Sequence, residues 1–142
     1  MQAERMKQMN EILNALRQAG TFYLATVEDN MPKVRPHGFA MEYRGKLCFS
    51  TGNQKPTFRQ LMSNPNVEIC AMFGQTSWLR LHGKARRITD EQSREAALAE
   101  MPALKSNYGD PDKYMEIFCL EDASADIYSF GPTGIETRTV PC

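Results

Sequence analysis

The first part of the chain spaces its apolar residues as an amphipathic helix does. They recur every three or four positions and so share one stripe of a helix. These residues are Met6, Met9, Ile12, Leu13 and Leu16. Gly20 follows the stripe, at a place where a residue that accepts a left-handed backbone commonly ends a helix. The pattern predicts a helix over Ala3–Gln18.

Beyond this helix the spacing changes to that of strands and turns. Phe22–Val27 is rich in aromatic and β-favouring residues, and Glu28–Pro32 is a turn. Lys33–Tyr43 is expected to form one long second strand. Arg44–Gly45 is another tight turn, which leads into a strand over Lys46–Ser50.

The second half of the chain alternates strands with short helices. The expected elements, in order, are a helix over Thr57–Met62, a hairpin of Val67–Phe73 and Thr76–Ile88, a helix from Thr89 to about Met101, an irregular segment over Pro102–Asp112, and strands near Tyr114–Glu121, Ala123–Phe130 and Gly134–Val140. Thr89 is expected to cap its helix. Successive hairpins imply antiparallel pairing, and closure removes exposed strand edges. We therefore expect a mainly β protein, a six- to seven-stranded antiparallel barrel with flanking helices.

Composition limits the size and the setting of this barrel. The 142 residues fit a single domain, residues 1–142, with an N-terminal helix. Lys+Arg and Asp+Glu both number 17, so no net charge attracts nucleic acid or an anionic membrane. No apolar run suits a signal peptide or a membrane span. Cys48, Cys70, Cys119 and Cys142 form no CxxC or metal-binding pattern, and we expect a reducing, cytoplasmic setting without a metal site.

A strand-end loop in the first half of the chain has the features of a phosphate site. The strand ends in Ser50 and Thr51, whose hydroxyls can donate hydrogen bonds, and Lys55 adds a positive charge where a helix begins. Backbone N–H groups in such a loop and at a helix N-terminus also attract anions. Asn53 and Thr57 lie in the same loop and either join this site or act only as local helix caps.

A second group of candidate binding residues lies upstream, on the strand expected over Lys33–Tyr43. Arg35 can give two parallel hydrogen bonds to a phosphate, or can instead pair with a surface carboxylate. Pro36 removes a backbone donor, which suits an edge strand or a gap in the barrel. His37 titrates near neutrality and can move a proton, although a lone strand histidine more often has a structural role.

These segments together resemble a known family. The matching segments, in order, are Thr21–Thr26, Lys33–Phe39, Leu47–Thr51 with Lys55 and Leu61, Asn64–Val67 and Trp78–Ala85. In this order and spacing the chain is similar to the pyridoxamine-5′-phosphate-oxidase-like group of FMN-binding split barrels. The similarity is to its small members, which are described as general-stress or flavin-nucleotide-binding proteins.

The resemblance implies a split-barrel homodimer with FMN sites at the subunit interface and a small-molecule substrate. The implied FMN-binding residues are Arg35, Pro36, His37, Gly38, Ser50, Thr51, Asn53, Lys55, Thr57 and Trp78. Trp78 would stack near the flavin of the partner subunit or fill the interface. No residue is singled out as catalytic, because a flavin itself carries the redox chemistry.

Three classes of function remain open from the sequence. The first is an FMN-dependent oxidoreductase that acts on a small molecule, with reduction of nitro compounds as one possibility. The full oxidases of the family carry a basic pair where this chain has Pro56-Thr57, which argues against pyridoxamine phosphate as the substrate. The second is a non-catalytic flavin- or haem-binding protein that serves as a stress protein or redox carrier, and the third is a cofactor-free dimeric structural protein.

Overall fold

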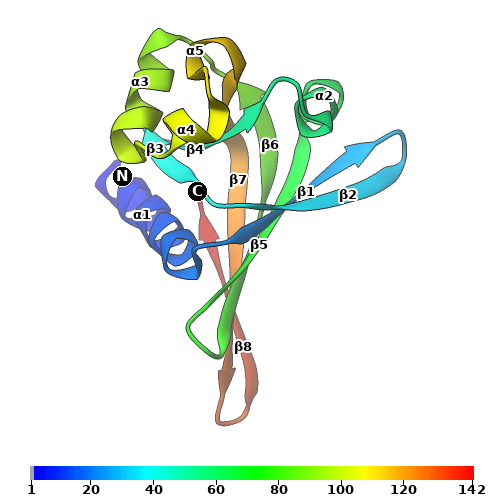
Figure 1. The fold of residues 1–142 in the computed structure, drawn as a ribbon. Helices are drawn as coiled ribbons and strands as arrows, with labels where there is room; N and C mark the ends of the chain where they lie inside the picture. Colours follow the sequence, from blue (N-terminus) through cyan, green and yellow to red (C-terminus); the bar gives the residue numbers. More distant parts are fainter. Residues whose placement is uncertain (1) are drawn as a thin grey trace.

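Eight antiparallel strands form one curved sheet with five helices around it among residues 2–142, the part of the chain that the computed structural model describes (Figure 1). The helices are α1 (Gln2–Ala19), α2 (Pro56–Ser63), α3 (Glu91–Glu100), α4 (Leu104–Tyr108) and α5 (Pro111–Tyr114). The strands are β1 (Phe22–Glu28), β2 (Met31–His37), β3 (Ala40–Tyr43), β4 (Lys46–Gly52), β5 (Asn66–Phe73), β6 (Ser77–Arg87), β7 (Met115–Gly131) and β8 (Gly134–Pro141). The expected mainly β, antiparallel class is confirmed, with eight strands rather than six or seven. None of the helices within residues 2–142 combines the length and the apolar character needed to cross a membrane.

The two edges of the sheet are joined by a very short link. The strand order is β2-β1-β5-β6-β7-β4-β3, with β8 added to β7. β2 and β3 thus lie at opposite ends of the order, although only Gly38 and Phe39 separate them in the chain. Because each residue spans at most about 3.6 Å, the two edges must come close together, and the sheet curls into a barrel. No pairing joins β2 to β3 among the described residues, so the barrel is split along this line.

The expectation of one long strand over Lys33–Tyr43 is therefore wrong. Its first part, in β2, pairs with β1, and its second part, in β3, pairs with β4. The sequence pattern continues through the break without a change of period, which hides the change of partner. Pro36 lies on the edge strand β2, in agreement with its missing backbone donor.

The main core fills the inside of the barrel, and α1 packs against it. The buried residues of α1 are Met9, Ile12, Leu13, Ala15 and Leu16. They join inward-facing strand residues such as Phe22 and Ile69 in one apolar cluster. Gly20 has a φ of 77°, and its N–H donates to the Leu16 carbonyl at 3.1 Å. The helix therefore ends where its sequence predicts.

Helices α3, α4 and α5 cover a second, smaller core beside β3, β4 and β7, and they group together at the top of Figure 1. The segment Pro102–Asp112, expected to be irregular, contains α4 and the start of α5. Leu104, which is 4% exposed, anchors α4 in this core. The cap of α3 is Asp90 rather than the expected Thr89, because the Asp90 side chain accepts from the Ser93 N–H at 2.7 Å.

β7 is one long strand rather than the two that the sequence predicts. It runs for 17 residues and bends at Asp122, whose φ is 51°. Opposite this bend β6 has a register shift at Gly83. A Cβ at Gly83 would lie 2.9 Å from the Ala123 Cβ and 3.1 Å from the Glu121 carbonyl oxygen. The two strands therefore approach closely at the bend only because Gly83 has no side chain.

We expect Gly83→Ala to destabilise the protein, because the added Cβ overlaps β7. Overpacking of this kind costs about 1–3 kcal/mol of unfolding free energy, which urea unfolding would measure. Gly38→Ala is the matched control, since a Cβ there would meet only the Gly20 carbonyl oxygen, at 3.9 Å. Equal stability of the Gly83→Ala variant and the unchanged protein would contradict the close approach.

Candidate functional site

A cavity of about 420 Å³ lies where the barrel is split, a volume typical of small-molecule sites. Its walls are the end of β2 with the link to β3, the end of β4 with the following loop, and the helices α4 and α5. Six of the ten predicted binding residues line it together, namely Pro36, His37, Gly38, Ser50, Thr51 and Lys55. The fold thus joins the two candidate groups that lie apart in the sequence.

One hydroxyl in the cavity wall has no hydrogen-bond partner. Thr51 is 1% exposed, and its Oγ1 is buried without a partner within residues 2–142. The Tyr43 hydroxyl is the other such atom in this part of the chain, and it does not line the cavity. An unpaired buried hydroxyl costs on the order of 1–3 kcal/mol. Its position in a cavity wall indicates a ligand that would complete it.

The cavity is rich in hydrogen-bond donors and carries one permanent positive charge. None of its described lining residues is Asp or Glu, whereas Ser50, Thr51, Tyr108 and Tyr114 have hydroxyl groups and Lys55 has an ammonium group. Lys55 is also the N-cap of α2, where the helix dipole adds partial positive charge. No carboxylate among the described residues pairs with Lys55. This environment favours an anionic ligand with many acceptor oxygens.

His37 contributes a neutral imidazole to the cavity wall. Its ring centroid lies 5.9 Å from that of Phe22 and 5.9 Å from that of Phe49. Nδ1 is 3.0 Å from the Pro36 carbonyl oxygen, which can only accept, so Nδ1 holds the proton and Nε2 keeps its lone pair. Burial lowers the pKa of His37, and the nearby cationic side chains lower it further. The imidazole therefore adds no charge to the cavity at neutral pH.

Arg35 lies in a separate polar cluster between β2 and α2. Its Nη1 donates to the Leu24 carbonyl at 3.0 Å, and its Nη2 donates to Gln60 Oε1 at 2.6 Å. Gln60 also accepts from Thr26 Oγ1 at 2.5 Å and donates to Glu28 at 2.7 Å. Arg35 is not among the residues that line the cavity. In this structure it fastens α2 to the first two strands.

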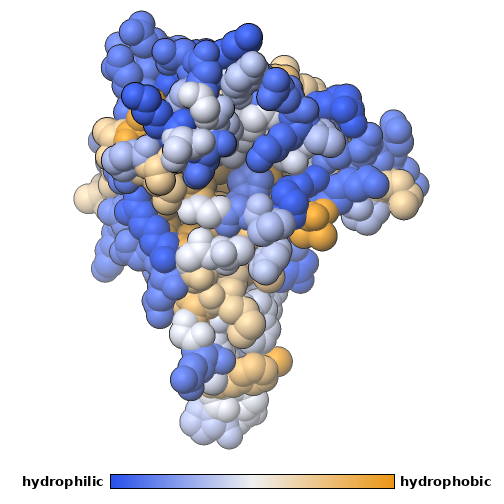
Figure 2. All heavy atoms as spheres, in the orientation of Figure 1, coloured by the Kyte–Doolittle hydropathy of each residue, from blue (hydrophilic) through white to orange (hydrophobic). Residues whose placement is uncertain are grey.

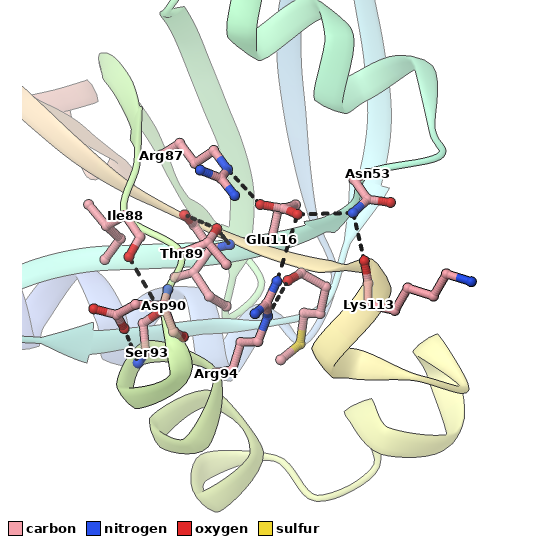
Figure 3. Close-up of polar contacts among 11 residues, drawn as sticks. Asn53, Arg87, Ile88, Thr89, Asp90, Ser93, Arg94, Lys113 and Glu116 are labelled. Carbon is pink, nitrogen blue, oxygen red and sulfur yellow. Dashed lines mark hydrogen bonds and ion pairs between the residues drawn. The ribbon is translucent and has the colours of Figure 1, made fainter.

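Three further predicted residues also lie outside the cavity lining. Asn53 points away from it, and its Nδ2 donates to the Lys113 carbonyl at 2.9 Å (Figure 3). Thr57 is buried in the first turn of α2. Trp78 lies on the outer side of the sheet, where its ring stacks on Tyr128 with centroids 5.0 Å apart.

A buried carboxylate holds the strand-end loop from behind (Figure 3). Glu116 of β7 is 4% exposed; its Oε1 accepts from Arg87 Nε at 2.6 Å and its Oε2 from Asn53 Nδ2 at 3.0 Å. Arg94 Nη2 lies 3.9 Å from Oε2. Burial pushes the pKa of Glu116 up, but the hydrogen bonds from Asn53 and Arg87 outweigh it and leave the pKa below the usual 4.5. The cluster ties the loop after β4 to β6 and β7.

Sequence reasoning missed the helical wall of the cavity. Tyr108 Oη lies 3.0 Å from Ser50 Oγ, which links α4 to the end of β4. Asn107 and Tyr114 line the same wall. The only available signal was a pair of tyrosines in a segment without hydrophobic periodicity, and that signal does not show which way a side chain points.

The family model described as pyridoxamine 5′-phosphate oxidase matches residues 8–118 of this chain. The chain belongs to the pyridoxamine 5′-phosphate oxidase family. The matched residues include β1 to β6 and so include the β2 and β4 walls of the cavity. The resemblance inferred from the sequence is confirmed. Comparison with curated proteins gave no match.

Solved structures share this split-barrel fold. A NimC/NimA family protein from Clostridium acetobutylicum is 33% identical, with a TM-score of 0.91 over 99% of this chain and 96% of that chain. A pyridoxamine 5′-phosphate oxidase-related, FMN-binding protein from Nostoc punctiforme is 19% identical, with a TM-score of 0.63 over 94% and 95%. A heme-binding protein from Mycobacterium smegmatis is 16% identical, with a TM-score of 0.65 over 98% and 58%. The last two show likeness of fold alone.

We expect Glu116 to make the protein sensitive to acid. A folded-state pKa below 4.5 means that the carboxylate stabilises the fold above that pH and loses its contribution as the pH falls through the folded-state pKa. Glu116→Gln should therefore lower stability at pH 7 and flatten the decline of stability as the pH falls below 4.5. Glu95→Gln is the control, because Glu95 is exposed on α3. An unchanged pH profile of unfolding in Glu116→Gln would contradict this role.

Proposed function

We propose that this protein is an FMN-binding flavoprotein and an oxidoreductase that acts on a small molecule. The observation that carries the proposal is the buried Thr51 hydroxyl, which has no partner within residues 2–142, in a cavity with no Asp or Glu among its described lining residues. The family assignment and the FMN-binding neighbour from Nostoc punctiforme support it. All four cysteines are free thiols, which supports the proposed cytoplasmic setting.

The cavity residues fit the chemistry of FMN. A phosphate dianion needs a positive charge and several donors once it leaves water. Lys55 provides the charge, while Ser50 and Thr51 provide hydroxyl donors beside it. A cavity of about 420 Å³ is within the usual range for a ligand of this size.

The proposed roles divide along the cavity. Bound FMN would supply the redox chemistry. Lys55, Ser50 and Thr51 would bind and orient its phosphate and ribityl oxygens. His37 offers the lone pair on Nε2, which can accept a hydrogen bond or a proton from a bound molecule. Pro36 and Gly38 leave the edge of β2 open, because one lacks a backbone donor and the other lacks a side chain.

An exposed apolar face supports our proposal of a homodimer. The face, here called the outer apolar face, consists of Tyr23, Val34, Pro36, Cys70, Met72, Trp78, Tyr128, Phe130 and Ile135. Cross-strand registers place these residues on one side of β2, β1, β5, β6, β7 and β8, together with the Arg80–Glu68 ion pair and Asp126. Met72 and Phe130 are each 57% exposed, and Val34 is 67% exposed. Figure 2 shows hydrophobic atoms over the lower part of the sheet, where β5 to β8 lie.

The outer apolar face also meets the cavity. Pro36 belongs to both, because it lines the cavity and lies opposite Tyr23 in the β1–β2 register. A second subunit on this face would therefore reach the rim of the cavity. This continuity supports our proposal that the FMN sites lie at a dimer interface, with Trp78 as an interface residue.

A non-catalytic carrier of flavin or haem is the second candidate. It is favoured by His37, whose neutral imidazole in the cavity could bind the iron of a haem, and by the heme-binding neighbour. The absorption spectrum of the purified protein separates the two ligands, because flavin bands bleach on reduction and haem gives a Soret band. Turnover with a reduced nicotinamide donor and a nitroaromatic acceptor would separate an enzyme from a carrier.

We expect Thr51→Val to weaken FMN binding and to stabilise the protein that has no ligand. Valine keeps the shape of threonine but removes the unpaired hydroxyl, so unfolding free energy should rise by about 1 kcal/mol. FMN affinity should fall about fivefold to tenfold with the loss of one donor, as measured by flavin fluorescence titration.

Thr26→Val is the matched control for this variant. Thr26 is also 1% exposed, but its hydroxyl donates to Gln60, so its removal should destabilise the protein. A Thr51→Val variant with undiminished FMN affinity, or an unchanged protein that binds no FMN, would refute the proposed site.

We expect Met72→Glu to dissociate the dimer, because it places a charge in the centre of the outer apolar face. Sedimentation velocity would show the smaller species. Met62→Glu is the control, because Met62 is 56% exposed and lies on α2, outside that face. A protein that sediments as a monomer before any substitution would contradict the proposed interface.

A further inference from the structure

We infer that Tyr108 and Ser50 act as a pair that binds the phosphate end of the ligand and lets the cavity select FMN over riboflavin. The inference rests on the proposed function, since it assigns a role within the same cavity. It adds a binding residue from the helical segment between β6 and β7.

The pair joins two parts of the chain that lie far apart in sequence. Tyr108 Oη and Ser50 Oγ are 3.0 Å apart, with one group on α4 and the other on β4. The Tyr108 ring packs against the second core, and Ser50 is 5% exposed. Neither group therefore has much freedom to turn away. Both line the cavity.

The pair keeps one proton for a ligand. Two hydroxyls that bond to each other use a single O–H, whichever one donates. The second O–H has no other partner among the described residues, so it can donate to an acceptor in the cavity. Burial raises the pKa of Tyr108, which keeps the phenol protonated at neutral pH. The pair is therefore a donor and not a phenolate that would repel an anion.

The position of Gly52 places this donor beside the positive charge. A Cβ at Gly52 would lie 3.6 Å from Tyr108 Cε1 and 3.7 Å from both Cγ and Cε of Lys55. The tyrosine ring and the lysine stem therefore flank the same backbone position. The free O–H of the Tyr108–Ser50 pair thus lies beside the Lys55 side chain, which suits a phosphate dianion better than a neutral sugar alcohol.

The test is a set of variants titrated with FMN and with riboflavin, which lacks the phosphate. The Tyr108→Phe, Ser50→Ala double variant removes both hydroxyls and should weaken FMN binding about tenfold, as expected for loss of one hydrogen bond to a charged group, and should change riboflavin affinity less than twofold. Each single variant leaves one hydroxyl with a free O–H and should lose less FMN affinity. The loss in the double variant should therefore exceed the sum of the two single losses.

Tyr43→Phe is the matched control, because Tyr43 also packs against the second core, but its unpaired hydroxyl does not line the cavity in the part of the chain that the structure describes. It should leave both affinities unchanged. Thermal unfolding of each variant without ligand would report any merely structural effect, which lowers FMN and riboflavin affinity together.

Four outcomes would overturn the inference. The first is an unchanged FMN affinity in the double variant while the unchanged protein binds FMN. The second is an equal loss of affinity for FMN and riboflavin, and the third is strictly additive effects of the two substitutions. The fourth is an unchanged protein that binds neither flavin, which would refute the proposed function along with this inference and is distinguished from the others by the first titration.

Discussion

The link between β2 and β3 is the constraint on which the rest of the structure depends. Only two residues, Gly38 and Phe39, join strands at opposite ends of the sheet order, so the sheet has to curl until its edges meet. The edges do not pair, and backbone at the end of β2 is left facing a cavity instead of a neighbouring strand. The interior of the curl holds the main core. One short connection therefore determines the barrel, its split and the location of the site.

The polar groups around the split fall into two kinds. Gln60 and Glu116 are buried, but each is satisfied by several partners at 2.5–3.0 Å, and each fastens a helix or a loop to the sheet. The Thr51 hydroxyl, in contrast, is left unpaired in a cavity wall. Buried polar groups whose hydrogen bonds are all made stabilise one arrangement of the backbone. A buried polar group without a hydrogen-bond partner lowers stability until a ligand pairs with it. This difference separates scaffold from site more clearly than residue type does, since Thr26 and Thr51 are both buried threonines and only the Thr26 hydroxyl has a partner among the described residues.

Much of the local structure could be predicted from the sequence, and the failures have physical causes. The α1 stripe and its Gly20 stop were correct, because helical period and a left-handed terminus are local properties. The break at Gly38–Phe39 was missed, because alternation does not record which strand a residue pairs with. Asp90 and Thr89 are both good caps, and only the fold shows that Thr89 Oγ1 instead accepts from the Ile117 N–H at 2.8 Å. The short α4 helix is fixed by the contact of Leu104 with the second core, which no local pattern encodes. The β2 and β4 residues that line the cavity were predicted from the sequence. Arg35 and Asn53 were predicted with them but lie outside the cavity lining. Tyr108 was missed, because no local pattern shows that α4 packs beside β4.

The helical segment α3–α5 has a consequence for how this protein can change over evolution. The segment follows β6, leads into β7 and packs on the second core. In the opposite wall of the cavity, Ser50, Thr51 and Lys55 belong to β4 and the loop after it. Substitutions or insertions in the segment would reshape one side of the cavity and leave the register of the sheet untouched. New substrate preferences could thus arise by substitutions within residues 91–114 without any change to the strands of the barrel. Apart from Tyr108, the helical half of the site can therefore diversify while the β4 half stays the same.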